Sequence, residues 1–489
     1  MKNLMLISLV VLNGITLFGQ GKFFKIYDDN AYDYGQGIIQ LKDSSYMVTG
    51  SSSSFMDAPS QAFLMKIDKN GNHIWAKDYG YEEGDGGKRV LSAFNDSIFF
   101  IIGYTQSSTG NGFDILFVKT DSNGVQLEKK VIALDNWERI NDAKIMGDSM
   151  LYLVGETTNT ANLNSNFLLV KMDVNGDTLW TKNWGTSGDD YLKAIEPLDN
   201  NSFLSVGAVY NADSSMTKCY VTKFDFNGVV AWEKQYGANG KYWLNDFYIY
   251  QNHIFASGGN WNETYQDKDE FFLRINTDGS PYSWDFESPE EGEREALGAV
   301  LYGDSSKSYV VRHFNNNFSA ENSYDLSYMR YENNLDFEWS TSNIPTVTLG
   351  FPLDDAFGEI IPTSDGGWVA TGTTPSQTNG GAAVYVLKVG PNDDLPTINL
   401  ASVQSLVEVI NLEDVAVKLY PNPVITSLTI DGLTSKTLVT IKDVQGKELF
   451  SSFINDSATI SFVEWNSGIY LVTLQTETEE RSTVRIIKN

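Results

Sequence analysis

Acidic side chains recur at one offset along the chain. An acid stands 17 residues before each of four glycines and before Arg312, and another stands 18 residues before Gly103. The unit around Gly258 departs, with Lys241 at the corresponding place. The four glycines are Gly50, Gly155, Gly207 and Gly372. The six acids are Asp33, Asp85, Glu138, Asp190, Glu295 and Asp355.

Carboxylates gathered in one place would bind a cation or a cationic ligand, because they are strong oxygen donors of negative charge. The alternative is that each acid caps backbone amides between repeated units. Recurrence in nearly every unit favours this alternative, since repeats preserve what stabilises them. The six acids are therefore candidate ligand-binding residues, and the capping interpretation stays open beside this one.

Aromatic side chains form a second candidate set, in polar segments between predicted strands. Exposed aromatic rings stack on sugars or anchor protein contacts. The alternative is that each ring folds down over the adjacent strands. Trp261 and Tyr265 are the chosen candidates; the others are Phe55, Phe113, Trp137, Tyr210, Phe318 and Tyr324.

Catalytic and metal-binding groups are scarce. The chain has three histidines, His73, His253 and His313, and one cysteine, Cys219. No Ser-His-Asp set, multi-histidine metal site or cysteine cluster follows from these. Paired acids such as Asp189 and Asp190 could serve glycosidic acid–base chemistry, although acid runs usually lie solvated on a surface. We predict no metal, no cofactor and no enzymatic activity.

The elements that position these residues come from a repeat of about 52 residues. Its clearest copies run from Phe63 to Gly80, from Leu168 to Gly185 and from Tyr220 to Gly237. The glycine of the shared Asp-x-Asn-Gly pattern and of its weaker copies falls at 71, 124, 176, 228 and 279. Each unit predicts four short strands, a to d, with a tight turn between c and d. Two degenerate copies follow.

Seven such units predict an all-β fold, a seven-bladed β-propeller over residues 20–390. Residues 23–27 match a lone strand d and residues 383–389 a lone strand c. Their pairing would close the ring and remove both exposed edges. The repeats resemble bacterial propeller repeats built on a Lys-x-Asp-x-Asn-Gly hairpin followed by Trp, which implies a fold and no chemistry. A calcium loop would need more acidic ligands and a closing Glu, so we interpret this element as a turn.

Strand direction assigns the two faces of the ring. The a–b and c–d hairpins share one face, which we call the hairpin face. The b–c and d–a loops share the other, which we call the loop face. The b–c loops are long, polar and different from one another, so the loop face is the candidate surface. The six acids would ring the channel mouth there.

Charge and the first residues indicate where the protein goes. With 35 Lys and Arg against 63 Asp and Glu, the net charge of −28 argues against binding nucleic acid. Residues 1–19 combine a basic start, an apolar run and a small end, which predicts a signal peptide cleaved between Gly19 and Gln20. We expect no transmembrane segment in the mature protein.

The last part of the chain departs from the repeat. Residues 391–416 predict a linker, and residues 417–489 a small β-sandwich domain. The latter contains the segments Leu419-Tyr-Pro-Asn-Pro423, Val439-Thr-Ile-Lys-Asp-Val-Gln-Gly-Lys447, Ser467-Gly-Ile-Tyr-Leu-Val472 and Arg485-Ile-Ile-Lys-Asn489. In these segments it resembles the type A C-terminal sorting domain of type IX secretion.

This resemblance implies export across the outer membrane to the cell surface or medium. It also implies two partners, the type IX translocon and a surface sortase that removes the domain. The residues expected to carry the signal are Tyr420, Pro421, Asn422, Pro423, Gly468 and Tyr470.

Three functions fit these observations. The leading hypothesis is a surface binding or adhesion module for a glycan or protein ligand. The second is a carbohydrate-active hydrolase or lyase that uses loop-face carboxylates. The third is a surface scaffold without a ligand.

Overall fold

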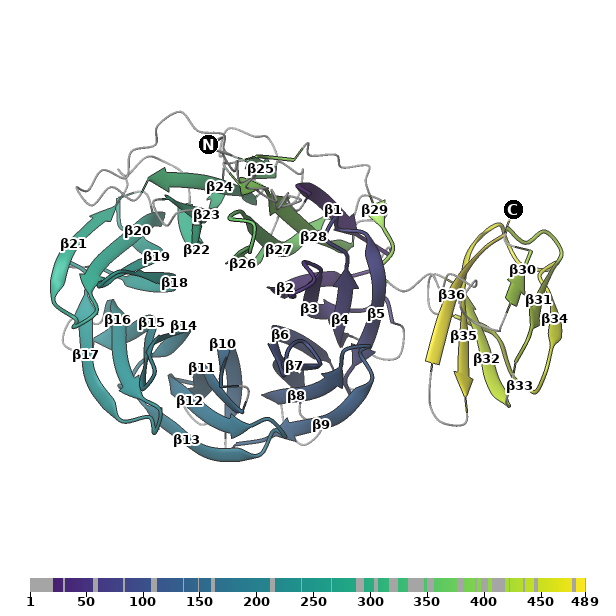
Figure 1. The fold of residues 1–489 in the computed structure, drawn as a ribbon, viewed down its shortest axis with the longest axis horizontal. Helices are drawn as coiled ribbons and strands as arrows, with labels where there is room; N and C mark the ends of the chain where they lie inside the picture. Colours follow the sequence, from purple (N-terminus) through teal and green to yellow (C-terminus); the bar gives the residue numbers. More distant parts are fainter. Residues whose placement is uncertain are drawn as a thin grey trace, which may run out of the picture.

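The computed structural model describes most of the chain between residues 21 and 488 (Figure 1). The described residues are 21–29, 31–55, 60–81, 84–106, 112–134, 136–147, 149–159, 163–211, 216–238, 240–264, 266–286, 294–302, 307–315, 324–332, 347–349, 356–375, 381–391, 394–396, 403–406, 418–421, 423–433, 436–443, 447–476 and 481–488.

Strands of the repeat region form a ring of antiparallel sheets around a central channel (Figure 1). Among the described residues there are seven such sheets. Strand a of each sheet lies innermost, and strands b, c and d follow outward in order, so the fold is an all-β propeller.

The first three sheets are made of β2 (Asp33–Gln40), β3 (Tyr46–Ser52), β4 (Gln61–Ile67) and β5 (His73–Tyr79); β6 (Asp85–Ala93), β7 (Ile98–Gln106), β8 (Phe113–Asp121) and β9 (Gln126–Ile132); and β10 (Trp137–Met146), β11 (Met150–Thr158), β12 (Ser165–Asp173) and β13 (Thr178–Trp184).

The next three are made of β14 (Tyr191–Asp199), β15 (Ser202–Asn211), β16 (Met216–Asp225) and β17 (Val230–Tyr236); β18 (Tyr242–Tyr250), β19 (His253–Asn262), β20 (Asp267–Asn276) and β21 (Pro281–Phe286); and β22 (Arg294–Tyr302), β23 (Lys307–Asn315), β24 (Tyr324–Glu332) and β25 (Val347–Leu349).

The remaining sheet of the ring joins the two ends of the repeat region. Its order is β26 (Ala356–Pro362), β27 (Trp368–Pro375), β28 (Ala382–Val389), β1 (Phe23–Tyr27) and β29 (Val403–Gln404). β1 pairs antiparallel with β28, from Phe23 opposite Lys388 to Tyr27 opposite Val384. This pairing leaves neither strand with a free edge at the seam.

The c–d hairpins are built by the Asp-x-Asn-Gly turn. In the first sheet, Asp68 Oδ1 accepts the backbone N–H groups of Asn70 and Asn72, each at 2.8 Å. Gly71 takes a φ of 76°, in the left-handed region that suits glycine. The Asp68 carboxylate therefore accepts hydrogen bonds from the backbone of its own turn. This agrees with the interpretation of the element as a plain turn.

The cores lie between neighbouring sheets, where side chains of one sheet pack on the next. Phe117 and Phe100 of one sheet, for example, share a cluster with Leu168 and Val170 of the following sheet. The middle strands b and c are buried on both faces, which explains their nearly continuous apolar sequences. These contacts fix the inner strands around the channel.

Part of the segment predicted as a linker packs on the propeller instead. β29 runs parallel to β1, and Leu406 is fully buried in the core of the seam. The Gln404 amide donates to the Gly71 carbonyl at 3.0 Å and accepts the His73 N–H at 2.8 Å. A strand of two residues is too short to show an alternation of apolar and polar side chains, so the sequence could not predict it. We call residues 403–406 the strap.

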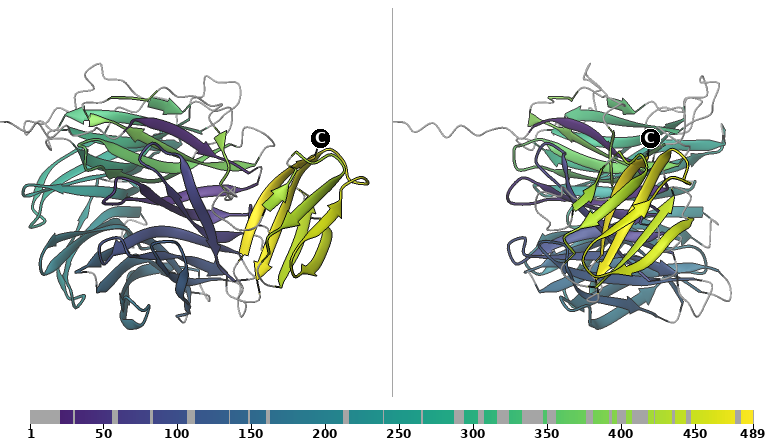
Figure 2. Two further views of the ribbon diagram at one scale, coloured as in Figure 1. Left: turned by 45° about the vertical axis from the view of Figure 1, so that its right-hand side comes forward. Right: turned by 90° about the vertical axis from the view of Figure 1, so that its right-hand side faces the viewer.

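The tail forms a small β-sandwich, shown in yellow and light green in Figure 2. Its core gathers apolar side chains of both sheets, including Leu428 and Ile430 of one sheet and Val439 and Val472 of the other. One sheet contains β30 (Lys418–Tyr420), β31 (Ser427–Asp431) and β34 (Ala458–Ser461); the other contains β33 (Glu448–Ile454), β32 (Thr437–Asp443), β35 (Gly468–Thr476) and β36 (Arg481–Lys488). The predicted fold class, a propeller followed by a small C-terminal β-sandwich, is confirmed.

Candidate functional site

Of the acids predicted to ring the channel mouth, the five that the structure describes lie at the start of the inner strands, and four of them are buried in the protein. Asp33 and Asp85 are the first residues of β2 and β6, and Asp190 directly precedes β14. All three are fully buried, and Glu138 is almost so. They therefore do not form an open ring of carboxylates.

Asp33 holds the end of its neighbouring strand. Its Oδ1 accepts hydrogen bonds from the hydroxyl groups of Ser52 at 2.5 Å and Ser54 at 2.9 Å. Burial raises the pKa of Asp33 to about 7, although these two hydroxyls oppose the shift. Burial likewise raises the pKa of Glu138 to about 7, opposed by the hydroxyl of Thr157.

Asp190 and Asp85 hold the loops that lead into their strands. Asp190 accepts the backbone N–H of Tyr210 at 2.7 Å and that of Thr186. Asp85 Oδ2 accepts the backbone N–H of Tyr81 at 2.6 Å. These contacts match the capping alternative, because they satisfy loop amides that would otherwise be buried without partners.

Glu295 makes different contacts. It forms an ion pair with Lys268 at 3.0 Å and accepts hydrogen bonds from Trp243 Nε1 at 2.7 Å and Asn245 Nδ2 at 2.9 Å. Burial by itself would raise the pKa of Glu295, but these partners together hold it below its ordinary value. Asp355, the last of the six acids, lies outside the described residues. Ligand binding by the six acids stays a prediction.

Of the two chosen aromatic residues, the structure describes one. Trp261 is partly buried at the end of β19, and its backbone N–H donates to the Lys241 carbonyl at 2.9 Å. The Lys241 ammonium lies 5.8 Å from the centre of the Trp261 ring. Lys241, which replaces the acid in this unit, is thus close to the aromatic residue. Tyr265 lies outside the described residues.

Every inner strand carries a β-bulge, a feature that the sequence analysis did not predict. In each of the seven described a–b pairs the register shifts by one residue on strand a. A bulge inserts one unpaired residue and re-aims its side chain. The seven bulged residues are Gln36, Lys88, Asn141, Lys193, Asn245, Leu297 and Gly358.

The bulges explain the glycines from which the acids were counted. A Cβ added at Gly207 would lie 1.9 Å from the Tyr191 carbonyl oxygen, and one at Gly155 would lie 1.9 Å from that of Arg139. At these glycines the strand-a backbone approaches strand b too closely for any side chain. The sixth sheet has the same bulge with Arg312 at the corresponding position, so the glycine is a steric requirement of the sheets that carry it and not of every bulge.

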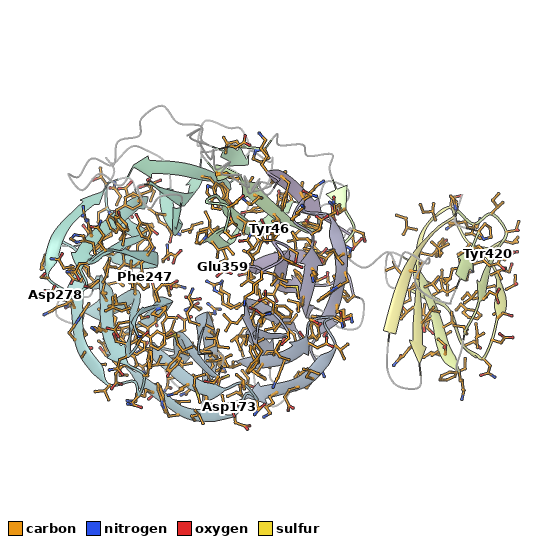
Figure 3. All side chains as sticks on the ribbon, viewed as in Figure 1. Tyr46, Asp173, Phe247, Asp278, Glu359 and Tyr420 are labelled. Atoms are coloured by element: carbon orange, nitrogen blue, oxygen red, sulfur yellow. The ribbon has the colours of Figure 1, made fainter. Side chains whose placement is uncertain are left out.

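The bulged strands line a cavity of about 650 Å³ in the central channel. The cavity extends from the middle of the channel, at Lys88 and Lys193, toward Pro197 and Pro362 near the ends of their strands. Both prolines are exposed, so the cavity reaches solvent toward the hairpin face, whereas the sequence pointed to the loop face as the candidate surface. Figure 3 places Glu359, another lining residue, beside the central opening.

One arginine links three sheets within this cavity. Arg89 Nε lies 2.8 Å from Asp142 Oδ1 and 3.4 Å from Glu359 Oε1. The second oxygen of each acid accepts a backbone N–H of the next sheet, from Ile195 and Ile38 respectively. Burial would raise the pKa of Asp142, but Lys144 and Arg89 with that N–H hold it below its usual range. Both carboxylates are thus structural ion-pair partners.

Two lining lysines are placed differently. Lys88 Nζ donates to Gln36 Oε1 at 2.9 Å, and Lys193 Nζ lies 4.9 Å from the centre of the Tyr191 ring. Burial lowers the pKa of Lys88 to about 7, and the nearby charges of Arg89 and Lys193 add to this shift. Burial also lowers the pKa of Lys193.

The sequence signal that could have identified the bulged residues is their nearly constant place in the repeat. The bulged residue stands 13 to 15 positions before the glycine of strand b or its replacement Arg312, as Lys193 does before Gly207. A search for alternation misses it, because the inserted residue interrupts the period of two.

Groups able to hold a metal are not found among the described residues. His73 is packed under the strap, where burial lowers its pKa to about 4. Cys219 is fully buried in β16, as its place in a core strand predicts. In the described part of the chain, no helix has the length and apolar character to cross a membrane.

The predicted sorting residues fall at two places in the sandwich. Tyr420, at the end of β30, is exposed, as are Pro421 and Pro423 after it. Gly468 is exposed at the start of β35, and Tyr470 is buried in the core. The Tyr470 hydroxyl donates to the Asn466 carbonyl at 2.6 Å. Asn422, Gly19 and Gln20 lie outside the described residues.

Fold and tail together define a propeller protein with a sorting domain. Residues 418–489 match the family model described as the secretion system C-terminal sorting domain. The predicted type IX sorting domain is therefore confirmed, and with it the predicted export to the cell surface or extracellular space.

Two solved structures show weak overall similarity to the chain. One is PorZ of Porphyromonas gingivalis, described as a bacterial surface component of the type-IX secretion system, at 11% identity and a TM-score of 0.28, covering 94% of this chain and 74% of PorZ. The other is the acylaminoacyl peptidase of Pyrococcus horikoshii, at 10% identity and a TM-score of 0.41, covering 82% of this chain and 58% of the peptidase. No curated protein matches the chain.

Proposed function

We propose that this exported protein is a non-catalytic binding module, whose propeller holds a glycan or protein ligand at the cell surface. The observation that carries the proposal is the 650 Å³ cavity, which combines charged side chains with an apolar wall. Pockets that mix apolar walls with a few polar groups are typical ligand sites.

The state of the carboxylates favours binding over hydrolysis. A glycosidic general acid needs a raised pKa and access to the substrate. In the channel, Asp142 and Glu359 are engaged by Arg89, and the pKa of Asp142 is lowered. Burial raises the pKa of Glu196, but this carboxylate is held in an ion pair by Lys144, which opposes the shift. The loop-face acids Asp33 and Glu138 have raised pKa values, but they are buried.

A glycan array combined with a polysaccharide-degradation screen tests the proposal on the exported chain. We expect saturable binding to at least one glycan class or surface protein and no release of reducing ends. Release of reducing ends would replace this proposal with the hydrolase alternative. Absence of binding to glycans and to surface-protein extracts would favour a scaffold.

A further inference from the structure

The bulged residues differ from sheet to sheet, although the bulge itself recurs. Three neighbouring sheets place Lys88, Asn141 and Lys193 at this position, whereas the sixth and seventh place Leu297 and Gly358 there. Features shared by all sheets serve the architecture. The unshared side chains make the channel asymmetric, with a cationic arc facing a less polar one.

The cationic arc carries four basic side chains, Lys88, Arg89, Lys144 and Lys193, and the acids Asp142, Glu196, Asp246 and Glu359 line the same cavity. Arg89 is paired with Asp142 and Glu359, and Lys144 with Glu196 at 2.7 Å. Among the described residues, neither Lys88 nor Lys193 has an ion-pair partner. An ammonium group has three donors, and Lys88 uses one of them on Gln36.

Both ammonium groups belong to the lining of the same cavity, Lys88 on the bulge of the second sheet and Lys193 on that of the fourth. A lysine without an ion-pair partner in a confined cavity costs stability, because burial disfavours a charge that is not compensated. An anion bound in the cavity would take up the unused donors.

The opposite wall fits an uncharged body attached to that anion. Phe357, Leu297 and Ile361 line it, and Ile249 lies near the cavity opening. Apolar and aromatic side chains of this kind pack against the face of a sugar ring or a similar compact body. The cavity thus offers two unpaired cations on one side and an apolar surface on the other.

We propose that the central channel binds the anionic group of a small acidic sugar or a comparable organic anion, held by Lys88 and Lys193. This inference rests on the proposed binding function and specifies its ligand class. Carboxylate, phosphate and sulfate share the required chemistry, since each accepts charge-assisted hydrogen bonds from lysine.

Isothermal titration of the full chain with glucuronate, glucose 6-phosphate and glucose 6-sulfate tests the proposal, with neutral glucose for comparison. We expect at least one acidic sugar to bind and glucose to bind at least about tenfold more weakly, because charged hydrogen bonds are lost. The double variant Lys88→Gln/Lys193→Gln should lose at least about tenfold in affinity. Lys130→Gln, on an outer strand, is the matched control and should bind as the parent chain does.

The single variants keep the test informative if the double variant does not fold, and thermal melting establishes folding for each. The proposal is overturned if no acidic sugar binds, if glucose binds equally well, or if affinity survives in the folded variants. A glycan array that remains positive under any of these results would leave the proposed binding function standing and remove only the anionic ligand.

Discussion

Arg89 and Glu359 form an ion pair across the channel, with 3.4 Å between Arg89 Nε and Glu359 Oε1. They come from the second sheet and from the closing sheet, which are separated along the ring by the first sheet. Arg89 also pairs with Asp142 of the third sheet. Sheets that do not adjoin are therefore connected through one side chain at the axis.

Replacing Arg89 by Leu should destabilise the propeller strongly. The change removes the cation that Asp142 and Glu359 share, and removing one partner of a buried pair costs about 3–5 kcal/mol. Urea unfolding measures this loss. Lys130→Gln removes an exposed pair with Asp177 and should leave the midpoint nearly unchanged. Equal midpoints for both variants would show that the channel network is not stabilising.

Replacing Gly207 by Ala should also destabilise the fold. The new Cβ would lie 1.9 Å from the Tyr191 carbonyl, so the bulge must move, and overpacking of this kind costs about 1–3 kcal/mol. Gly84→Ala is the control, since its Cβ would meet its nearest neighbours at 3.5 Å. Calorimetric melting compares the two, and an unchanged melting temperature for Gly207→Ala would contradict the steric explanation.

Replacing Leu406 by Ala should destabilise the propeller, whereas the same change in a linker that packs on nothing would have no effect. Leu406 is fully buried in the seam, and truncating such a residue costs about 2–5 kcal/mol. Leu179→Ala, at an exposed strand position, should cost little. Thermal unfolding of both variants measures the difference. If Leu406→Ala melts like the parent chain, the strap does not contribute to stability.

Stability should decline between about pH 4 and pH 7 because of Asp33 and Glu138. Burial raises both folded-state pKa values to about 7, above their ordinary values of 3.8 and 4.5. The stabilisation from the protonated forms is fully present below the ordinary pKa values and is lost as the pH rises through about 7.

The double variant Asp33→Asn/Glu138→Gln removes this dependence, because neither amide titrates. Its unfolding free energy should fall less between pH 5 and pH 8 than that of the parent chain, as measured by urea titration at each pH. Asp177→Asn, at an exposed acid, serves as the control. Parallel pH profiles for parent and double variant would refute the assignment.

The fold could be predicted because its main signals are local. Asp68 and Gly71 define a hairpin by themselves, and their equivalents recur at a nearly constant spacing. The acids were also found at the strand starts. Their burial was not foreseeable, since it depends on how the loop around Thr186 or the strand end at Ser54 folds over them.

The channel site was missed for a different reason. Lys88 follows Gly86 and Gly87 and precedes Arg89, a segment that suggests a polar turn rather than a strand. The position of Lys88 depends on a register shift between β6 and β7. Lys193, which lines the same cavity, is 105 residues away in the sequence. Such a site exists only after the ring has assembled.

The pairing of β1 with β28 also has a consequence for biosynthesis. Phe23 leaves the ribosome long before its partner Lys388, which is made more than 360 residues later. Until then β1 remains an unpaired edge, and closing so long a loop is slow. The ring can therefore close only after the ribosome has passed residue 388.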